Sequence, residues 1–159
     1  MSDIRMALLG VLAITAASCG PQYIDDTKIE DNPTNRTIMN LVEVYRLAVE
    51  QKDVNVLAKI VSNQYFDNAG TTGYSGDDYG LKTVLVQVLP LLQENIKEVF
   101  YKIRVKRIDL MGQTANVILD YELKFHYVEG DLDGWSTKAD SHRLDLVWED
   151  ESWKIAGGL

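Results

Sequence analysis

The first half of the chain carries apolar residues at helical spacing. The pair Asn32-Pro33 is a helix start signal, and a stripe of apolar positions three and four residues apart follows it. Asp53 can cap a second, shorter helix. A third helix is predicted over residues 81–95, where Pro90 kinks or ends it. The stripe of the first helix comprises Ile38, Leu41, Val42, Tyr45, Ala48 and Val49.

From Lys97 onward the apolar period changes to two, which predicts strands. The phase slips by one residue near Lys106-Arg107, which indicates a β-bulge. Tight turns are predicted at 111–113 and 149–152, and a longer loop at Glu129–Gly134. Inward positions of the strands include Val99, Tyr101, Ile103 and Val105, then Ala115, Val117, Leu119, Tyr121, Leu123, Phe125 and Tyr127, then Leu144, Leu146 and Trp148.

Three N-terminal helices followed by an antiparallel series of strands predict an α+β fold. The parity of the strands and the spacing of the helices also predict the core. Its expected members include Leu41, Tyr45, Leu57, Ile60, Leu119, Tyr121, Leu123, Leu146, Trp148 and Trp153.

Composition and charge narrow the choice of partners. Hydrophobic residues make up 46% of the 159 residues and charged residues 25%, which is ordinary for one folded domain. The net charge is −8, so the chain gains little from releasing the counterions of a phosphate backbone. We therefore expect no nucleic-acid partner.

The N-terminus has the order of a secretory signal: Arg5, the apolar run 6–17, small residues, and then Cys19, the single cysteine of the chain. This order resembles a bacterial lipoprotein signal, which implies cleavage of a signal peptide, residues 1–18, and lipidation of Cys19. An ordinary cleaved signal followed by a chance cysteine, or a cytosolic chain with an apolar start, is the alternative.

Residues 19–34 then comprise the lipidated cysteine and a polar, proline-containing flexible tether. Gly20, not Asp, follows the cysteine. The resemblance therefore implies sorting to the outer membrane, on its periplasmic or cell-surface side, with the lipid anchor at Cys19 as the contact with the membrane.

The remaining stretch, 35–159, resembles the nuclear transport factor 2-like fold, which includes ketosteroid isomerase, scytalone dehydratase and polyketide cyclases. The resemblance rests on two short helices leading into Tyr65-Phe66, a third helix, and long antiparallel strands that end in residues 153–159 (WKIAGGL). It implies a cone whose curved sheet wraps the helices and leaves a pocket at the open end. It also implies a possible homodimer through the outer sheet face, which carries Ile118 among polar residues.

Candidate chemistry concentrates at one pair of residues. Asp140 and His142 share parity with the core of the third long strand, so both can point into the mouth of the cone. A carboxylate beside a histidine can orient a general base. The alternative is that this half of the strand has left the core and that both residues lie at the surface. His126 has the opposite parity and is expected on the outer face.

Four tyrosines complete the candidate pocket, or are plain core aromatics: Tyr45, Tyr65, Tyr101 and Tyr121. No phosphate-binding loop, metal-ligand spacing or cofactor motif is present in the sequence, so we expect no metal and no cofactor. Two functions fit. The first is a membrane-anchored protein that binds a small apolar ligand or a protein partner without catalysis. The second is a small-molecule isomerase, dehydratase or cyclase that uses Asp140 and His142.

Overall fold

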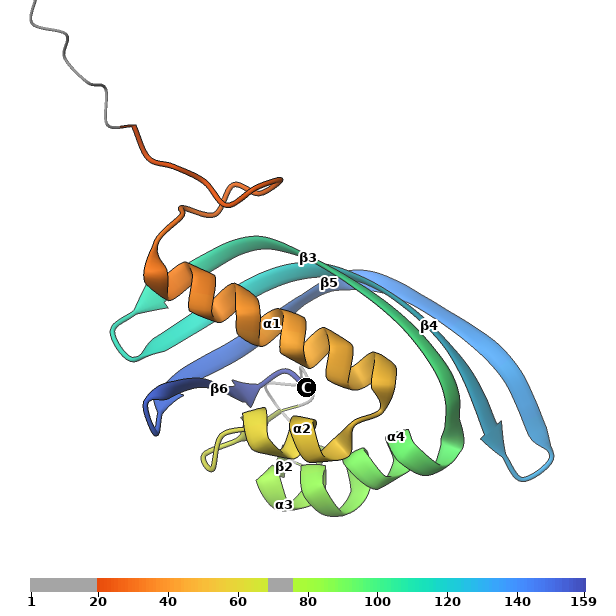
Figure 1. Ribbon diagram of the computed structural model, residues 1–159. Coiled ribbons are helices and arrows are strands. Elements are labelled where there is room, and N and C mark those ends of the chain that lie inside the picture. Colours follow the sequence, from red (N-terminus) through yellow and green to blue (C-terminus); the bar gives the residue numbers. More distant parts are fainter. Residues whose placement is uncertain (1–19, 69–75) are drawn as a thin grey trace, which may run out of the picture.

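The computed structural model describes residues 20–68 and 76–159 (Figure 1). The predicted signal peptide, Cys19 and part of the glycine-rich loop lie outside the described residues. Within the described part, no helix is long and apolar enough to cross a membrane.

Both predicted N-terminal helices begin at the expected caps. Helix α1 (Pro33–Gln51) starts where the Asn32 side chain accepts a hydrogen bond from the backbone N–H of Asn35, at 2.8 Å. Helix α2 (Val54–Ile60) is capped by Asp53, whose carboxylate accepts backbone N–H bonds of the first turn. These caps satisfy donors that have no partner inside the helix.

The third helical stretch covers the expected residues but contains a wide turn. It runs as α3 (Leu81–Thr83), the π-helical segment η1 (Val84–Val88) and α4 (Leu89–Asn95). Pro90 has no N–H to donate to the preceding turn. In η1 the Leu89 N–H bonds to the carbonyl of Val84, five residues back. The helix therefore passes Pro90 through a π-turn and ends at Asn95.

Four antiparallel strands form the main sheet in the order β3-β4-β5-β6. Two-residue turns at 112–113, 130–131 and 150–151 join them. The second turn is shorter than the predicted loop Glu129–Gly134, because strand pairing continues to Glu129 and Leu132. A second, two-stranded sheet consists of β1 (Phe66–Asp67) and β2 (Tyr79–Gly80). The main strands are β3 (Ile96–Met111), β4 (Thr114–Glu129), β5 (Leu132–Glu149) and β6 (Ser152–Gly157).

The predicted bulge is confirmed. Val105 pairs with Leu119 and Arg107 with Ile118, so Lys106 is the extra residue. An extra residue increases local bending of a strand. The long strands arch over α1, α2 and α4, which lie on the concave side of the sheet (Figure 1).

Most of the predicted core is confirmed. Six of the expected residues are buried: Leu41, Tyr45, Leu57, Leu119, Leu146 and Trp153. Ile60, Tyr121 and Leu123 are half-buried and pack against this core. The prediction was wrong for Trp148, which is 39% exposed. It pairs with Trp153 next to the last turn of the sheet, and the two rings meet edge-on with centroids 5.5 Å apart.

Edge strand β3 is closed by side chains of α1. Glu50 accepts the backbone N–H of Tyr101 at 2.8 Å, and Arg46 donates to the carbonyl of the same residue at 3.2 Å. Lys52 donates to the carbonyl of Ile96 at 2.8 Å. Backbone groups at the edge of a sheet otherwise offer a template for pairing with another chain. The described contacts thus cover part of this edge and fix α1 against β3.

The predicted tether packs against the domain over much of its length. Ile29 is only 4% exposed and belongs to the core, and Ile24 packs beside it. Tyr23 and Glu30 form an antiparallel bridge. The side-chain amide of Asn35 donates to the carbonyl of Glu30 at 2.9 Å. Residues 23–30 are therefore packed against the domain and are not part of a free linker.

Candidate functional site

Four of the six predicted pocket residues form one row of rings across the concave face. Tyr45 on α1 lies edge-on to Tyr101 on β3, with ring centroids 5.9 Å apart. Tyr101 meets Tyr121 on β4 at 6.0 Å, and Tyr121 meets His142 on β5 at 6.3 Å. These are favourable edge-to-face distances. The row joins α1 to three neighbouring strands.

The inner end of this row cannot supply a base near neutral pH. Burial raises the pKa of Tyr45 well above its ordinary value, and the neighbouring Tyr101 hydroxyl raises it further. Burial also raises the pKa of Tyr101. Both phenols therefore stay protonated and act only as hydrogen-bonding groups.

Tyr65 lies apart from the row, beside Tyr79 at 6.1 Å. Burial is the largest cause that raises its pKa. Its hydroxyl donates to the carboxylate of Asp67 at 3.2 Å and accepts the backbone N–H of Leu159 at 3.1 Å. Tyr65 thus holds a β1 carboxylate and the end of β6 together.

Asp140 and His142 share a face of β5, since they pair with Tyr121 and Leu119 of β4. The parity argument placed them on that face. However, Asp140 is exposed and accepts the backbone N–H of Ser141 at 2.7 Å. Among the described ion pairs, none joins Asp140 to His142. The carboxylate and the imidazole therefore do not form the orienting pair that the sequence suggested.

The hydrogen bond of His142 defines its tautomer. Its Nε2 lies 2.8 Å from the carbonyl oxygen of Gly158. A carbonyl oxygen only accepts, so Nε2 carries the proton and donates. In the neutral ring, the lone pair then belongs to Nδ1. His142 is half-buried between Tyr121 and the end of β6.

Asp67 binds Gly158, the same residue that accepts the hydrogen bond of His142. Its Oδ2 accepts the backbone N–H of Gly158 at 2.8 Å. The Gly158 residue thus donates to Asp67 through its N–H and accepts from His142 through its carbonyl. Gly158 has φ +83°, and an added Cβ would lie 2.2 Å from the carbonyl oxygen of Arg143. This arrangement requires glycine at the position.

These groups line an open cleft of about 490 Å³ between β1, β5 and β6. Arg143 and Asp145 form an ion pair at its wall, with Nε and Oδ1 2.9 Å apart. The cleft contains both a histidine and carboxylates, which are the side chains of acid–base chemistry. Its lining consists of Phe66, Asp67, Asn68, His142, Arg143, Asp145, Gly157 and Gly158.

A second feature lies on the same side of the sheet, beyond the helices. Ala115, Val117 and Leu119 of β4 are fully buried, but the next inward residues of the strand are only half-buried. Helix α1, with 19 residues, is ~28 Å long, whereas β4, with 16 residues, spans ~50 Å. The sheet therefore extends beyond α1, and this end of it is only partly covered. We call the partly covered row the open concave face: Tyr121, Leu123, Phe125 and Tyr127.

Polar side chains border the open concave face along β5. Ser136 pairs with Phe125, Lys138 with Leu123, and Asp140 with Tyr121. Directly paired residues of neighbouring strands lie on one face of the sheet. An apolar wall thus runs beside a polar strip that includes a cation and an anion.

Asp67 and Gly158 were missed by the sequence analysis. The glycine pair 157–158 after the last strand was the available signal, because two glycines at a strand end mark close backbone approach. Asp67 had no such mark, since its partner Gly158 lies 91 residues away in the sequence. Within residues 20–68 and 76–159, no three His, Cys, Asp or Glu side chains gather as metal ligands would.

No protein-family model matches the sequence, and no curated protein matches it either. Solved structures do match. A putative scytalone dehydratase from Novosphingobium aromaticivorans aligns with a TM-score of 0.64 at 14% identity, covering 79% of this chain and 80% of that chain. A type 2 hexachlorocyclohexane dehydrochlorinase (LinA) aligns with a TM-score of 0.59 at 17% identity, covering 79% and 82%.

A nuclear transport factor 2-like superfamily protein from Salmonella enterica gives a TM-score of 0.62 at 11% identity, covering 77% of this chain and 86% of that one. Identities this low speak to architecture and not to activity. The chain has the nuclear transport factor 2-like fold, with helices on the concave side of a four-stranded antiparallel sheet.

Proposed function

We propose that this protein is a lipoprotein, anchored through an acylated Cys19, whose domain binds a small apolar molecule without converting it. The order of apolar run, small residues and single cysteine supports the anchor. The absence of Asp directly after Cys19 supports an outer-membrane location. The open concave face is the binding surface in this proposal.

The observation that carries the proposal is the partly exposed, largely aromatic row of the open concave face. Apolar side chains that continue past their covering helix remain in contact with water, and covering them is favourable by about 25 cal/mol per Å². Flat aromatic rings favour a ring-bearing ligand. Lys138 and Asp140 beside the row provide partners for a polar substituent on it.

Two features favour binding over chemistry. No hydrogen bond or ion pair of the described residues joins Asp140 to His142, and the buried phenols stay protonated. A general base needs a neighbour that orients it and a free lone pair aimed at the substrate. His142 has a free lone pair on Nδ1 but no carboxylate neighbour that orients it, so it meets only part of that requirement.

The binding test uses a matched pair of variants. Leu123→Glu places a charge on the open concave face, and Phe100→Glu places the same charge on the opposite face of neighbouring strand β3. Both positions are partly exposed, so neither variant should prevent folding. With the neutral dye Nile red as probe, we expect L123E to lose most of the fluorescence enhancement and F100E to keep it. Equal enhancement in both would reject this surface.

The anchor has its own test. Changing Cys19→Ala should move the protein from the membrane to the soluble fraction and abolish labelling with a fatty-acid probe. Membrane association that persists in this variant would show that the cysteine is not the anchor.

A second candidate function is an elimination on a ring-bearing molecule. Its support is the His142 tautomer, which leaves a lone pair on Nδ1, together with neighbours described as dehydratases and dehydrochlorinases. Such a step moves a proton from carbon to the base while water or chloride leaves. Chloride release from hexachlorocyclohexane that His142→Gln abolishes and Asp140→Asn does not would favour this candidate over binding alone.

A further inference from the structure

The chain between Cys19 and the domain is unusually short. Residues 22–31 form a closed turn that we call the N-terminal hairpin. The Asp31 N–H bonds to the carbonyl of Gln22 at 2.7 Å, and the Ile24 N–H bonds to the carbonyl of Ile29 at 2.9 Å. With Ile29 in the core, this hairpin moves with the domain.

Only residues 19–21 remain between the proposed lipid anchor and the hairpin. Three residues span at most about 11 Å when fully extended. The headgroup layer on one side of a bilayer is about 5–7 Å thick. The first residues of the hairpin therefore cannot rise more than a few ångströms above the headgroups. This step rests on the proposed acylation of Cys19.

The surface around the hairpin carries apolar side chains in solvent. Tyr23 is 55% exposed and Met111, at the β3–β4 turn, is 56% exposed, with Leu110 exposed beside it. The hairpin and this end of β3 are neighbours, because Lys28–Asn35 and Lys106–Leu110 together line a cleft of about 300 Å³. Tyrosine favours the boundary between lipid and water.

Charge does not explain a preference for lipid at this end. Arg36 pairs with Asp31, and Lys106 with Asp120. Arg107 pairs with Asp109 at 2.8 Å. The hairpin itself carries Lys28 among four carboxylates, Asp25, Asp26, Glu30 and Asp31, so its own charge is negative and contact with a bilayer would not depend on anionic headgroups.

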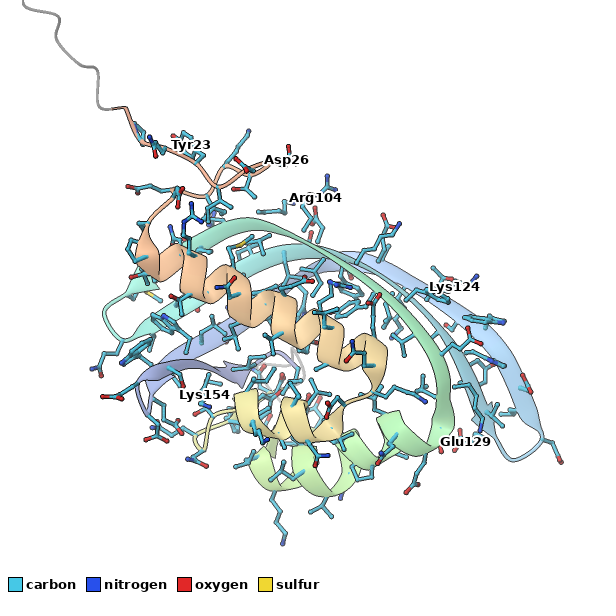
Figure 2. All side chains as sticks on the ribbon, in the orientation of Figure 1. Tyr23, Asp26, Arg104, Lys124, Glu129 and Lys154 are labelled. Carbon is cyan, nitrogen blue, oxygen red and sulfur yellow. The ribbon has the colours of Figure 1, made fainter. Side chains whose placement is uncertain are left out.

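The open concave face lies toward the opposite end of the molecule. In Figure 2, Tyr23 and Asp26 of the hairpin lie at one end and Glu129, the last residue of β4, at the other. The inward residues of β4 run in sequence from the buried Ala115 near the β3–β4 turn to Tyr127 near Glu129. The two ends are separated by the length of this strand.

We propose that the N-terminal hairpin and the β3–β4 turn rest on the lipid surface, so that the open concave face and the β4–β5 turn point away from the membrane. The short tether sets the distance, and the apolar rim of Tyr23, Leu110 and Met111 sets which side faces the lipid. The occupant of this surface is a bilayer, independent of its headgroup charge.

The test compares labels at the two ends of the lipidated full-length protein. Met111→Cys and Leu132→Cys place a small fluorophore at two strand turns of similar exposure, 56% and 61%. The protein is reconstituted into phosphatidylcholine vesicles that contain a headgroup-labelled, short-range quencher. We expect the label at 111 to lose most of its fluorescence and the label at 132 to keep it, with the same result at high salt.

A mass measurement on the same samples separates this inference from the proposed function. An unmodified Cys19 would overturn both. An acylated Cys19 with equal quenching at the two labels would overturn the orientation alone. Inserting ~20 Gly/Ser residues after Gly20 lengthens the tether to a root-mean-square span of about 25 Å and should remove most of the difference between the labels. An unchanged difference in that variant would reject tether length as its cause.

Discussion

Gly158→Ala tests the arrangement that joins Asp67, Gly158 and His142. An added Cβ would approach the backbone carbonyl oxygen of Arg143 to 2.2 Å, a clash that no side-chain rotation relieves. At φ +83°, alanine is also strained by about 1–2 kcal/mol. Undocking of residues 158–159 from Asp67, His142 and Tyr65 therefore costs less free energy than accommodating the new side chain.

The hydrogen bonds lost on leaving set the cost. The Gly158 N–H gives up the Asp67 carboxylate, the Gly158 carbonyl gives up His142, and the Leu159 N–H gives up Tyr65. At about 1 kcal/mol for each neutral bond and somewhat more for the bond to a carboxylate, the loss is about 3–4 kcal/mol. We expect the free energy of unfolding to fall by about that amount.

Gly112→Ala is the matched control for backbone strain. Gly112 has φ +65°, but an added Cβ there meets nothing within 4 Å. It should therefore cost only the strain, about 1–2 kcal/mol. Urea unfolding followed by tryptophan fluorescence measures both variants, and amide hydrogen exchange at Leu159 reports undocking. If G158A cost no more than G112A, and Leu159 stayed protected, the contacts described for Gly158 would not hold in solution.

Two further predictions concern the core and the response to acid. Leu119→Ala should lower the free energy of unfolding by about 2–5 kcal/mol, because Leu119 is fully buried. Trp148→Ala should lower it clearly less, because Trp148 is 39% exposed. Equal losses in the two variants would contradict the register of the strands. The Ser62 hydroxyl, bonded to Glu149 at 2.6 Å, is the main cause that lowers the pKa of this carboxyl. Folding lowers the pKa of Glu149 below its ordinary value of 4.5. The ionised carboxylate therefore stabilises the folded state fully above pH 4.5, and this stabilisation is lost as the pH falls through the lowered pKa. The stability advantage over Glu149→Gln should therefore shrink in acid, and an advantage independent of pH would count against this role.

Local chemistry explains why much of the fold was predictable from sequence. The caps at Asn32 and Asp53 act on backbone groups within three residues, so their sequence pattern is their structural cause. The slip at Lys106 appears in the alternation because one extra residue inverts the parity of every later side chain. The expectation of an α+β fold followed from these local signals, the curved sheet around the helices followed from the family resemblance, and both are confirmed.

Contacts between distant segments explain what the sequence left open. Parity correctly placed Asp140 and His142 on one face, but the exposure of each side chain depends on what packs over that part of the strand. Trp148 shows the same limit, since alternation assigns a face of a strand and not whether anything covers that face.

The amino-acid sequence by itself determined the main helices and strands, their order and their faces, because each depends on neighbours within a few residues. The tertiary structure alone decided that Asp67 meets Gly158 across 91 residues and that Ile29 of the predicted tether enters the core. It also decided that Tyr121 and Leu123 stay half-uncovered where the sheet outruns α1. Each of these follows from the relative lengths and packing of whole elements, which no local pattern encodes.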